Sequence, residues 1–236
     1  MRTALVFIVA VTLLASCVTV KPPIHVPRGP GWYTVKRSDT LYSIAWRYGL
    51  DYKELARWNS ININQPIYPG QRLRLIRPAD TAVVVREPAA EPAPSAPPQA
   101  NEKPPPSTQE IGPDPRAWLW PTDGKPLNTF LASDLDRRGI DIAGEPGQPV
   151  RAVAAGRVVY SGNGLAGYGN LIIIKHSDTF LSAYAYCQER LVQEGVSVKA
   201  GDLVAKMGRR DNQAKLYFEI RRNGKPVDPI KYLPDL

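Results

Sequence analysis

Histidine, the side chain that most often binds zinc or transfers protons at neutral pH, occurs only at His25 and His176 in 236 residues. A catalytic zinc ion needs about three nitrogen, oxygen or sulfur ligands from the protein. Cysteine also occurs only twice, at Cys17 and Cys187. This scarcity argues against most zinc-dependent and histidine-based catalysis.

The N-terminus has the pattern of an export signal. Met1-Arg2 precedes an apolar run over residues 4–15, which is shorter than a membrane-spanning helix, and small residues precede Cys17. The segment resembles a bacterial lipobox, which implies cleavage before Cys17 and a diacylglycerol anchor on its sulfur. We expect a signal peptide at 1–16 and a tether at 17–30. Because Val18 rather than aspartate follows Cys17, we expect anchoring in the outer membrane, facing the periplasm. The alternative is an N-terminal helix with a buried cysteine.

Composition changes abruptly at residue 77. Residues 77–115 contain 11 Pro and 7 Ala without apolar periodicity, which predicts an extended, semi-rigid linker. The segments 28–76 and 116–236 carry eight basic against three acidic and 17 basic against 13 acidic residues. Such modest charge, with no matching motif, gives no reason to expect a nucleic acid partner, and suits a partner with acidic groups.

Residues 31–76 predict a small β-α-α-β domain. Residues 32–35 predict a strand, Asp39 can cap a helix over 40–48, and Asp51 with Glu54 forms a capping-box pattern for a second helix. Pro69-Gly70 then turns the chain into an alternating strand at 71–75. The domain resembles LysM domains through Tyr33-Thr34-Val35, Asp39-Thr40-Leu41, Ile44-Ala45, Leu55, Asn59 and Ile67-Tyr68-Pro69-Gly70-Gln71.

The LysM resemblance implies binding of N-acetylglucosamine-containing glycan strands of peptidoglycan. It places the groove between loops 38–41 and 61–67, with candidate glycan-binding residues Ser38, Asp39, Thr40, Leu41, Asn62, Ile63 and Asn64. Asp39 fits a helix cap better than a ligand, and Leu41 also fits the core. Trp46 lies off the apolar face of the first helix and could serve as an exposed platform for a sugar.

Residues 116–236 predict a mostly antiparallel β domain, so the whole chain is expected to be α+β. Candidate strands lie at 149–153, 156–161, 170–175, 180–186, 202–206 and 216–221. The domain resembles M23 (LytM-type) peptidases through Trp120-Pro121, Arg138-Gly139-Ile140-Asp141-Ile142-Ala143, Ala155-Gly156-Arg157-Val158-Val159, Gly167-Tyr168-Gly169-Asn170, Lys175-His176 and Leu216-Tyr217-Phe218-Glu219-Ile220-Arg221.

The catalytic positions that this resemblance implies are mostly replaced. Active M23 peptidases bind zinc through His-x-x-x-Asp, where this chain has Arg137 and retains only Asp141. Tyr186 stands where a catalytic histidine follows Tyr-Ala, and Lys215-Leu216-Tyr217 replaces His-x-His. One carboxylate is too few ligands for zinc, and neighbouring cations would repel the ion.

We therefore predict a domain without catalytic residues, bound metal or cofactor. Asp141 is expected to pair with Arg137 or Arg138, or to accept backbone hydrogen bonds, and Tyr217 to fill the space of the metal. His176 lies outside the ligand set that the resemblance implies. Cys187, without a partner once Cys17 is lipidated, is expected to be buried and inert.

The combined features resemble the NlpD-like murein hydrolase activator lipoproteins. The resemblance implies that the altered M23-like domain binds a periplasmic zinc-dependent N-acetylmuramoyl-L-alanine amidase and displaces a helix from the amidase's own zinc site, in cell-wall remodelling and daughter-cell separation. Candidate contacts line the altered site and the loop before the last strand: Arg137, Asp141, Tyr186, Arg209, Arg210, Lys215 and Tyr217. Ordinary solvated surface is the alternative for the arginines.

Two other functions stay open. A passive lipoprotein could tether the outer membrane to peptidoglycan without activating an enzyme. A residual peptidase would need zinc ligands that the sequence does not supply.

Overall fold

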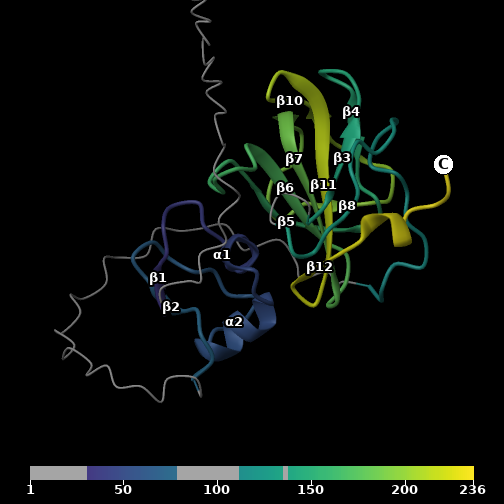
Figure 1. The fold of residues 1–236 in the computed structure, drawn as a ribbon. Helices are drawn as coiled ribbons and strands as arrows, with labels where there is room; N and C mark the ends of the chain where they lie inside the picture. Colours follow the sequence, from purple (N-terminus) through teal and green to yellow (C-terminus); the bar gives the residue numbers. More distant parts are fainter. Residues whose placement is uncertain (1–30, 79–111, 135–137) are drawn as a thin grey trace, which may run out of the picture.

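A computed structural model describes residues 31–78, 112–134 and 138–236 (Figure 1). The predictions for the signal peptide, the lipidated Cys17, the tether, most of the linker and Arg137 lie outside these residues. No helix within the described ranges has the length and apolar character needed to cross a membrane.

The N-terminal unit has the predicted β-α-α-β order. It consists of β1 (Trp32–Thr34), α1 (Leu41–Tyr48), α2 (Tyr52–Trp58) and β2 (Arg72–Arg74). The two strands pair antiparallel, with Tyr33 opposite Leu73. Asp51 caps α2 by accepting hydrogen bonds from the amides of Lys53 and Glu54, as the sequence predicts. This small unit is hereafter the LysM domain.

The cap of α1 differs from the prediction. Thr40, not Asp39, is the N-cap: its hydroxyl accepts from the Ser43 amide at 3.0 Å, and the Ser43 hydroxyl accepts from the Thr40 amide at 2.9 Å. Asp39 instead accepts a hydrogen bond from the Tyr33 hydroxyl at 2.6 Å and pairs with Arg47 at 3.3 Å. A reciprocal capping box satisfies two free amides at once, so threonine takes the cap and the aspartate ties α1 to β1.

The C-terminal unit is the predicted antiparallel β domain. Its main sheet runs β10-β11-β7-β6-β5-β8, while β3 and β12 also pair with β11, and β9 pairs with β4 and β7. The strands are β3 (Ile140–Ala143), β4 (Pro149–Arg151), β5 (Gly156–Gly162), β6 (Asn170–Lys175), β7 (Phe180–Arg190), β8 (Ser197–Val198), β9 (Leu203–Met207), β10 (Arg209–Arg210), β11 (Gln213–Arg222) and β12 (Lys225–Val227). All six predicted strands are present; β3, β8, β10 and β12 were not predicted.

The central strands are buried on both faces. On β11, Leu216, Phe218 and Ile220 enter the core of the β domain. The alternate residues Tyr217, Glu219 and Arg221 point to the opposite face and are also buried. A strand that is buried on both faces needs a covering layer on each side.

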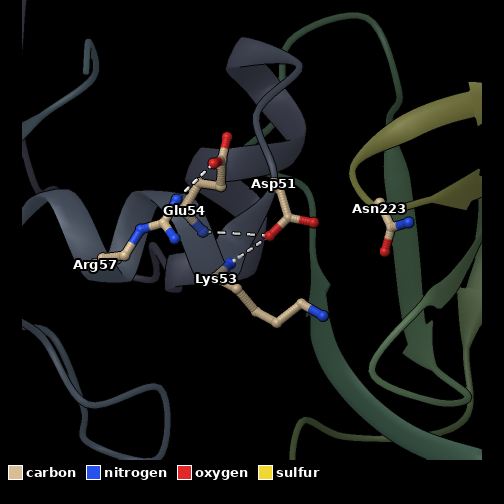
Figure 2. Close-up of a pocket in the computed structure, with 5 residues that line it drawn as sticks. All are labelled: Asp51, Lys53, Glu54, Arg57 and Asn223. Atoms are coloured by element: carbon tan, nitrogen blue, oxygen red, sulfur yellow. Dashed lines mark hydrogen bonds and ion pairs between the residues drawn. The ribbon is translucent and has the colours of Figure 1, made fainter. Parts of the chain in front are cut away.

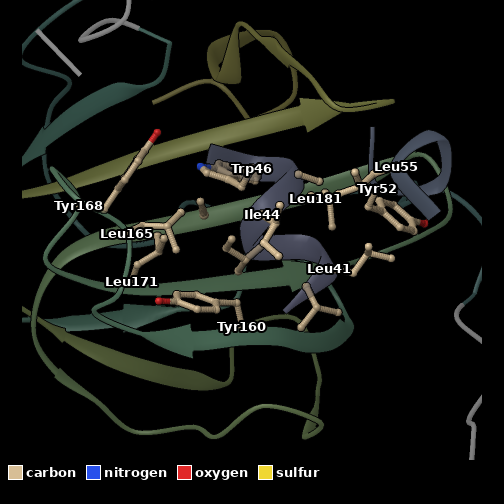
Figure 3. Packing of buried hydrophobic residues seen from close by; sticks show 14 of the residues in the cluster. Leu41, Ile44, Trp46, Tyr52, Leu55, Tyr160, Leu165, Tyr168, Leu171 and Leu181 are labelled. Carbon is tan, nitrogen blue, oxygen red and sulfur yellow. The ribbon is translucent and has the colours of Figure 1, made fainter. Parts of the chain in front are cut away.

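The LysM domain supplies the second layer. Figure 3 shows α1 lying across the sheet, with Leu41, Ile44 and Trp46 toward the strands. These residues share one continuous buried cluster with Tyr160 and Leu171 of the sheet. The sequence predicts two units joined by a linker and does not predict this contact. The covered sheet face is hereafter the outer face, and the opposite face is the inner face.

Candidate functional site

The altered peptidase site lies where β3 and β11 pair. Their register places Asp141 opposite Tyr217 and Ala143 opposite Lys215. The ammonium group of Lys215 lies 2.7 Å from Oδ2 of Asp141, and both side chains are largely buried. Lys215 was not among the predicted partners of Asp141, which were Arg137 and Arg138; the neighbouring strand brings Lys215 within reach, and Arg137 lies outside the described residues.

Tyr217 lies beside this ion pair in a cluster of three tyrosines. Its ring centroid is 5.8 Å from that of Tyr168 and 5.9 Å from that of Tyr186. Its hydroxyl donates a hydrogen bond of 2.8 Å to Oε2 of Glu219. Burial first, and the nearby Glu219 carboxylate second, raise the pKa of Tyr217 well above its ordinary value. The phenol therefore stays protonated and acts as a hydrogen-bond donor.

Tyr186, at the position of the replaced histidine, has an uncommon backbone conformation. Its φ is 59°, in the left-handed region that a bulky side chain rarely adopts. Its amide donates to the Tyr168 carbonyl at 3.0 Å, and the Arg210 guanidinium lies 4.7 Å above its ring. The backbone is thus held in a tight conformation that presents the ring to a cation.

Arg209 and Arg210 were predicted to lie in a loop. In the structure they form the short strand β10. They pair with the start of β11, with Arg210 opposite Gln213. Asp211 and Asn212 make the connection with φ of 51° and 62°, which fits a tight hairpin turn. Arg209 is exposed and Arg210 half-buried, so β10 presents positive charge at the edge of the altered site.

The described residues at this site do not fit a catalytic zinc ion. The Asp141 carboxylate that would bind zinc is bound to the Lys215 ammonium. Of the nearby tyrosines, Tyr217 donates its hydroxyl to Glu219, and the Tyr186 ring contacts Arg210 while its buried hydroxyl has no hydrogen-bond partner among the described residues. Across the part of the chain that the structure describes, no group of three His, Cys, Asp or Glu side chains could hold a metal ion.

His176 and Cys187 are structural residues of the β domain. The His176 ring nitrogens lie 2.8 Å from the Ala155 carbonyl and 2.7 Å from the Ser182 hydroxyl. Burial lowers the pKa of His176 to about 4, so the ring is neutral at neutral pH. Cys187 is buried, as predicted, and burial raises the pKa of its thiol to about 12.

A buried ion pair on the outer face was not predicted from the sequence. Nε of Arg221 lies 2.7 Å from Oε1 of Glu219, and these side chains are 1% and 0% exposed. Arg221 also donates a hydrogen bond of 2.9 Å to the Trp46 carbonyl and stacks 3.6 Å from the Trp46 ring centroid. Trp46 is only 2% exposed, so the prediction of an exposed sugar platform is wrong. The alternation of charged and apolar residues on β11 was the available signal.

The predicted glycan-binding residues separate into two groups. Ser38, Asn62 and Asn64 are exposed, whereas Ile63 and Asp39 are half-buried. Thr40 donates a hydrogen bond of 3.2 Å to the Val159 carbonyl of β5, and Leu41 is buried in the shared cluster. One side of the predicted groove therefore faces the β domain.

Comparison with known proteins agrees with this organisation. The family model for the LysM domain matches residues 33–75, and that for peptidase family M23 matches residues 136–229. The Lipoprotein NlpD/LppB homolog of Pseudomonas aeruginosa is 40% identical, with 88% of this chain and 78% of the relative covered.

Two proteins of Escherichia coli strain K12 are also similar. The Uncharacterized lipoprotein YgeR is 43% identical, with 86% of this chain and 80% of the relative covered. The Murein hydrolase activator NlpD is 37% identical, with 89% of this chain and 70% of the relative covered. The chain therefore belongs to the NlpD/LppB family of lipoproteins that combine a LysM domain with an M23 domain.

Proposed function

We propose that this protein is a non-catalytic, lipid-anchored activator of periplasmic N-acetylmuramoyl-L-alanine amidases, acting in cell-wall remodelling and daughter-cell separation. The observation that carries the proposal is the 2.7 Å ion pair between Lys215 and Asp141 inside an M23-type domain. The ammonium group occupies the one zinc-binding carboxylate that the peptidase pattern retains. The domain keeps its fold without the means to hydrolyse a peptide, and a binding role is what the fold can still perform.

The relatives support activation rather than hydrolysis. The similar E. coli protein is named a murein hydrolase activator. The amidase-contact surface of this chain would combine Arg137, Asp141, Tyr186, Arg209, Arg210, Lys215 and Tyr217. Exposed positive charge on β10 suits an acidic segment of an amidase. An activator acts by preferring the open enzyme, and a hundred-fold shift requires ~2.7 kcal/mol of differential binding.

Anchoring and glycan binding would hold the activator at its site of action. Cys17 would carry the lipid, and a similar protein of Haemophilus influenzae is named an outer membrane antigenic lipoprotein. The exposed Ser38, Asn62 and Asn64 would contact peptidoglycan glycan strands. Binding to the same wall as the amidase raises the local concentration of both proteins.

The test mixes the full chain with a purified periplasmic amidase and dye-labelled sacculi. Dye release above that of the amidase alone is expected, with no release by the full chain alone. Arg209→Glu reverses the exposed charge on β10 and should reduce activation. Arg116→Glu, a matched reversal at an exposed arginine away from the altered site, should retain it.

Two results would contradict the proposal. If no periplasmic amidase gains activity, a passive tether between the outer membrane and peptidoglycan is the better explanation. If the full chain alone releases muropeptides and carries stoichiometric zinc, the domain is a peptidase.

A further inference from the structure

The outer face of the sheet is the surface that the LysM domain covers, and its residue types explain why it needs a cover. Leu171, Ile173 and Leu181 lie on this face, are at most 6% exposed, and share the buried cluster with α1. Without the LysM domain they would form a contiguous apolar patch beside Tyr217. Large apolar patches of this kind mark sites of protein binding.

The contact itself is more polar than a permanent core. Arg221 and Glu219 are buried as an ion pair, and Arg221 reaches the Trp46 carbonyl and ring. Lys175, 4% exposed, lies 5.0 Å above the ring of Tyr52 in α2. Buried ion pairs recover little more than their cost of desolvation. Separation of the domains returns these charges to water, so the contact can open more readily than an apolar one of equal size.

Close backbone contact at one turn also fixes the covered arrangement. Asn223 and Gly224 join β11 to β12 with φ of 49° and 74°. A Cβ atom at Gly224 would lie 2.6 Å from the backbone nitrogen and Cα of Asp51. An open pocket of about 510 Å³ lies beside this contact and is lined by Asp51, Lys53, Glu54, Arg57 and Asn223 (Figure 2). Polar side chains therefore line this edge of the contact between the two domains. Glycine is needed at position 224, where the two backbones approach each other.

The same contact covers parts of both predicted binding surfaces. Tyr217 and Tyr186, candidates for amidase contact, are 1% and 6% exposed and belong to the cluster shared with α1. Thr40 and Leu41, candidates for glycan contact, are occupied by Val159 and the shared cluster. A glycan strand on the 38–41 loop and the β domain would therefore compete for the same residues.

We propose that the LysM domain is an intramolecular cap on the outer face, and that a glycan strand bound at the 38–41 loop releases it. In the capped state, an amidase cannot reach the cluster of Tyr168, Tyr186 and Tyr217 at the altered site. In the released state, the LysM domain holds the glycan and the outer face is free. This inference rests on the proposed function, since it makes activation dependent on contact with the wall.

The coupling has a defined direction. A ligand shifts a two-state equilibrium only if it binds one state better, and the 38–41 loop is more accessible when released. The apparent affinity of a partner for the outer face scales with the fraction of released molecules. A variant that cannot close should therefore activate an amidase at lower concentration, and added glycan should change it little.

Gly224→Asn tests the cap with little other change. Asparagine tolerates a left-handed backbone, but its Cβ would collide with the LysM backbone at Asp51. Gly169→Asn is the matched control, because Gly169 has a φ of 60° and nothing within 4 Å of an added Cβ. Hydroxyl-radical footprinting of Trp46 and Tyr217 in the full chain reports the exposure of these side chains directly. Dye release from sacculi with a purified amidase reports activation.

We expect Gly224→Asn to expose Trp46 and to lower the concentration for half-maximal activation by about ten-fold, with Gly169→Asn unchanged. A soluble N-acetylglucosamine pentamer should expose Trp46 in the wild-type chain. If Gly224→Asn leaves Trp46 protected, Arg221→Ala must expose it, because that change removes the ion-pair partner of the buried Glu219 carboxylate and opening returns the carboxylate to water.

The inference is overturned if neither variant exposes Trp46, if saturating pentamer leaves it protected, or if the wild type activates an amidase and an opened variant activates it no better. Failure of the proposed function gives a different result. In that case, the pentamer still exposes Trp46, but neither the wild-type nor the opened chain activates any periplasmic amidase.

Discussion

The two faces of β11 bury their side chains by different means. On the inner face, Leu216, Phe218 and Ile220 pack into an apolar core and are fully buried. On the outer face, Tyr217, Glu219 and Arg221 are buried to the same extent through hydrogen bonds and an ion pair. Side chains that are equally buried on the two faces can therefore differ in how readily their contacts separate.

The difference identifies which layer holds the domain together and which can move. When buried apolar side chains are exposed to water, the free energy gained by burying them is lost and nothing compensates for it. Buried charges are solvated again when their cover leaves. We expect inner-face substitutions to unfold the β domain and outer-face substitutions mainly to weaken the contact with the LysM domain.

The largest effect is expected on the inner face. Phe218→Ala should lower the free energy of unfolding of the β domain by about 3–5 kcal/mol, through lost burial and the cavity left behind. Chemical denaturation followed by circular dichroism measures it. Phe218→Leu, which keeps more of the volume, should cost considerably less. A small effect of the alanine variant would remove the distinction between the two faces.

The second largest effect is expected from acid, which should lower the free energy of unfolding of the β domain. The pKa of His176 is lowered to about 4 from an ordinary value of 6.5, so the unfolded chain binds a proton that the folded chain does not. Stability is therefore unaffected above pH 6.5 and declines as the pH falls toward 4, by up to roughly 3 kcal/mol. Unfolding measured at several pH values tests this, and His176→Gln should remove this part of the pH dependence.

On the outer face, Tyr217→Phe should have a smaller effect. It removes the hydrogen bond to Glu219, and a hydrogen bond to a charged group contributes about 1.5–3 kcal/mol. The change should increase footprinting of Trp46 more than it lowers the midpoint of β-domain unfolding. A large fall in that midpoint with Trp46 still protected would show that both faces act as one core.

The smallest expected effect lies at Thr40. Thr40→Val loses both the helix cap and the hydrogen bond to the Val159 carbonyl, at a cost of about 1 kcal/mol. Thr40→Ser keeps the hydroxyl and should restore most of the loss. Thermal unfolding of the LysM domain compares the two, and equal midpoints would show that the hydroxyl contributes nothing there.

Local patterns predicted the elements well. The period of Leu41, Ile44 and Ala45 predicts α1, and short segments separated by Gly and Asn predict six strands, because these signals depend on neighbours in the sequence. The loss of the peptidase ligands could also be seen, since it needs only residue types at aligned positions. The short strands β8 and β10 have too few residues to carry a pattern.

Contacts between distant segments were predicted poorly. The Lys215–Asp141 pair depends on the register of β3 and β11, which no local pattern fixes. The helical period alone places Trp46 on a free face of α1, because it contains no information on a second layer. The run Leu171-Ile172-Ile173-Ile174 was a signal for that layer, since four consecutive apolar residues on a strand require a cover on both faces.

The Lys215–Asp141 pair makes the structure of the altered site independent of the supply of metal ions. Unlike a bound metal ion, the Lys215 ammonium group is covalently part of the chain. The protein therefore cannot lose it to a chelator or exchange it for another ion. The shape and charge of this part of the protein are therefore set when the chain folds, and a shortage of zinc in the surroundings would leave them unchanged while any zinc enzyme beside it lost its ion.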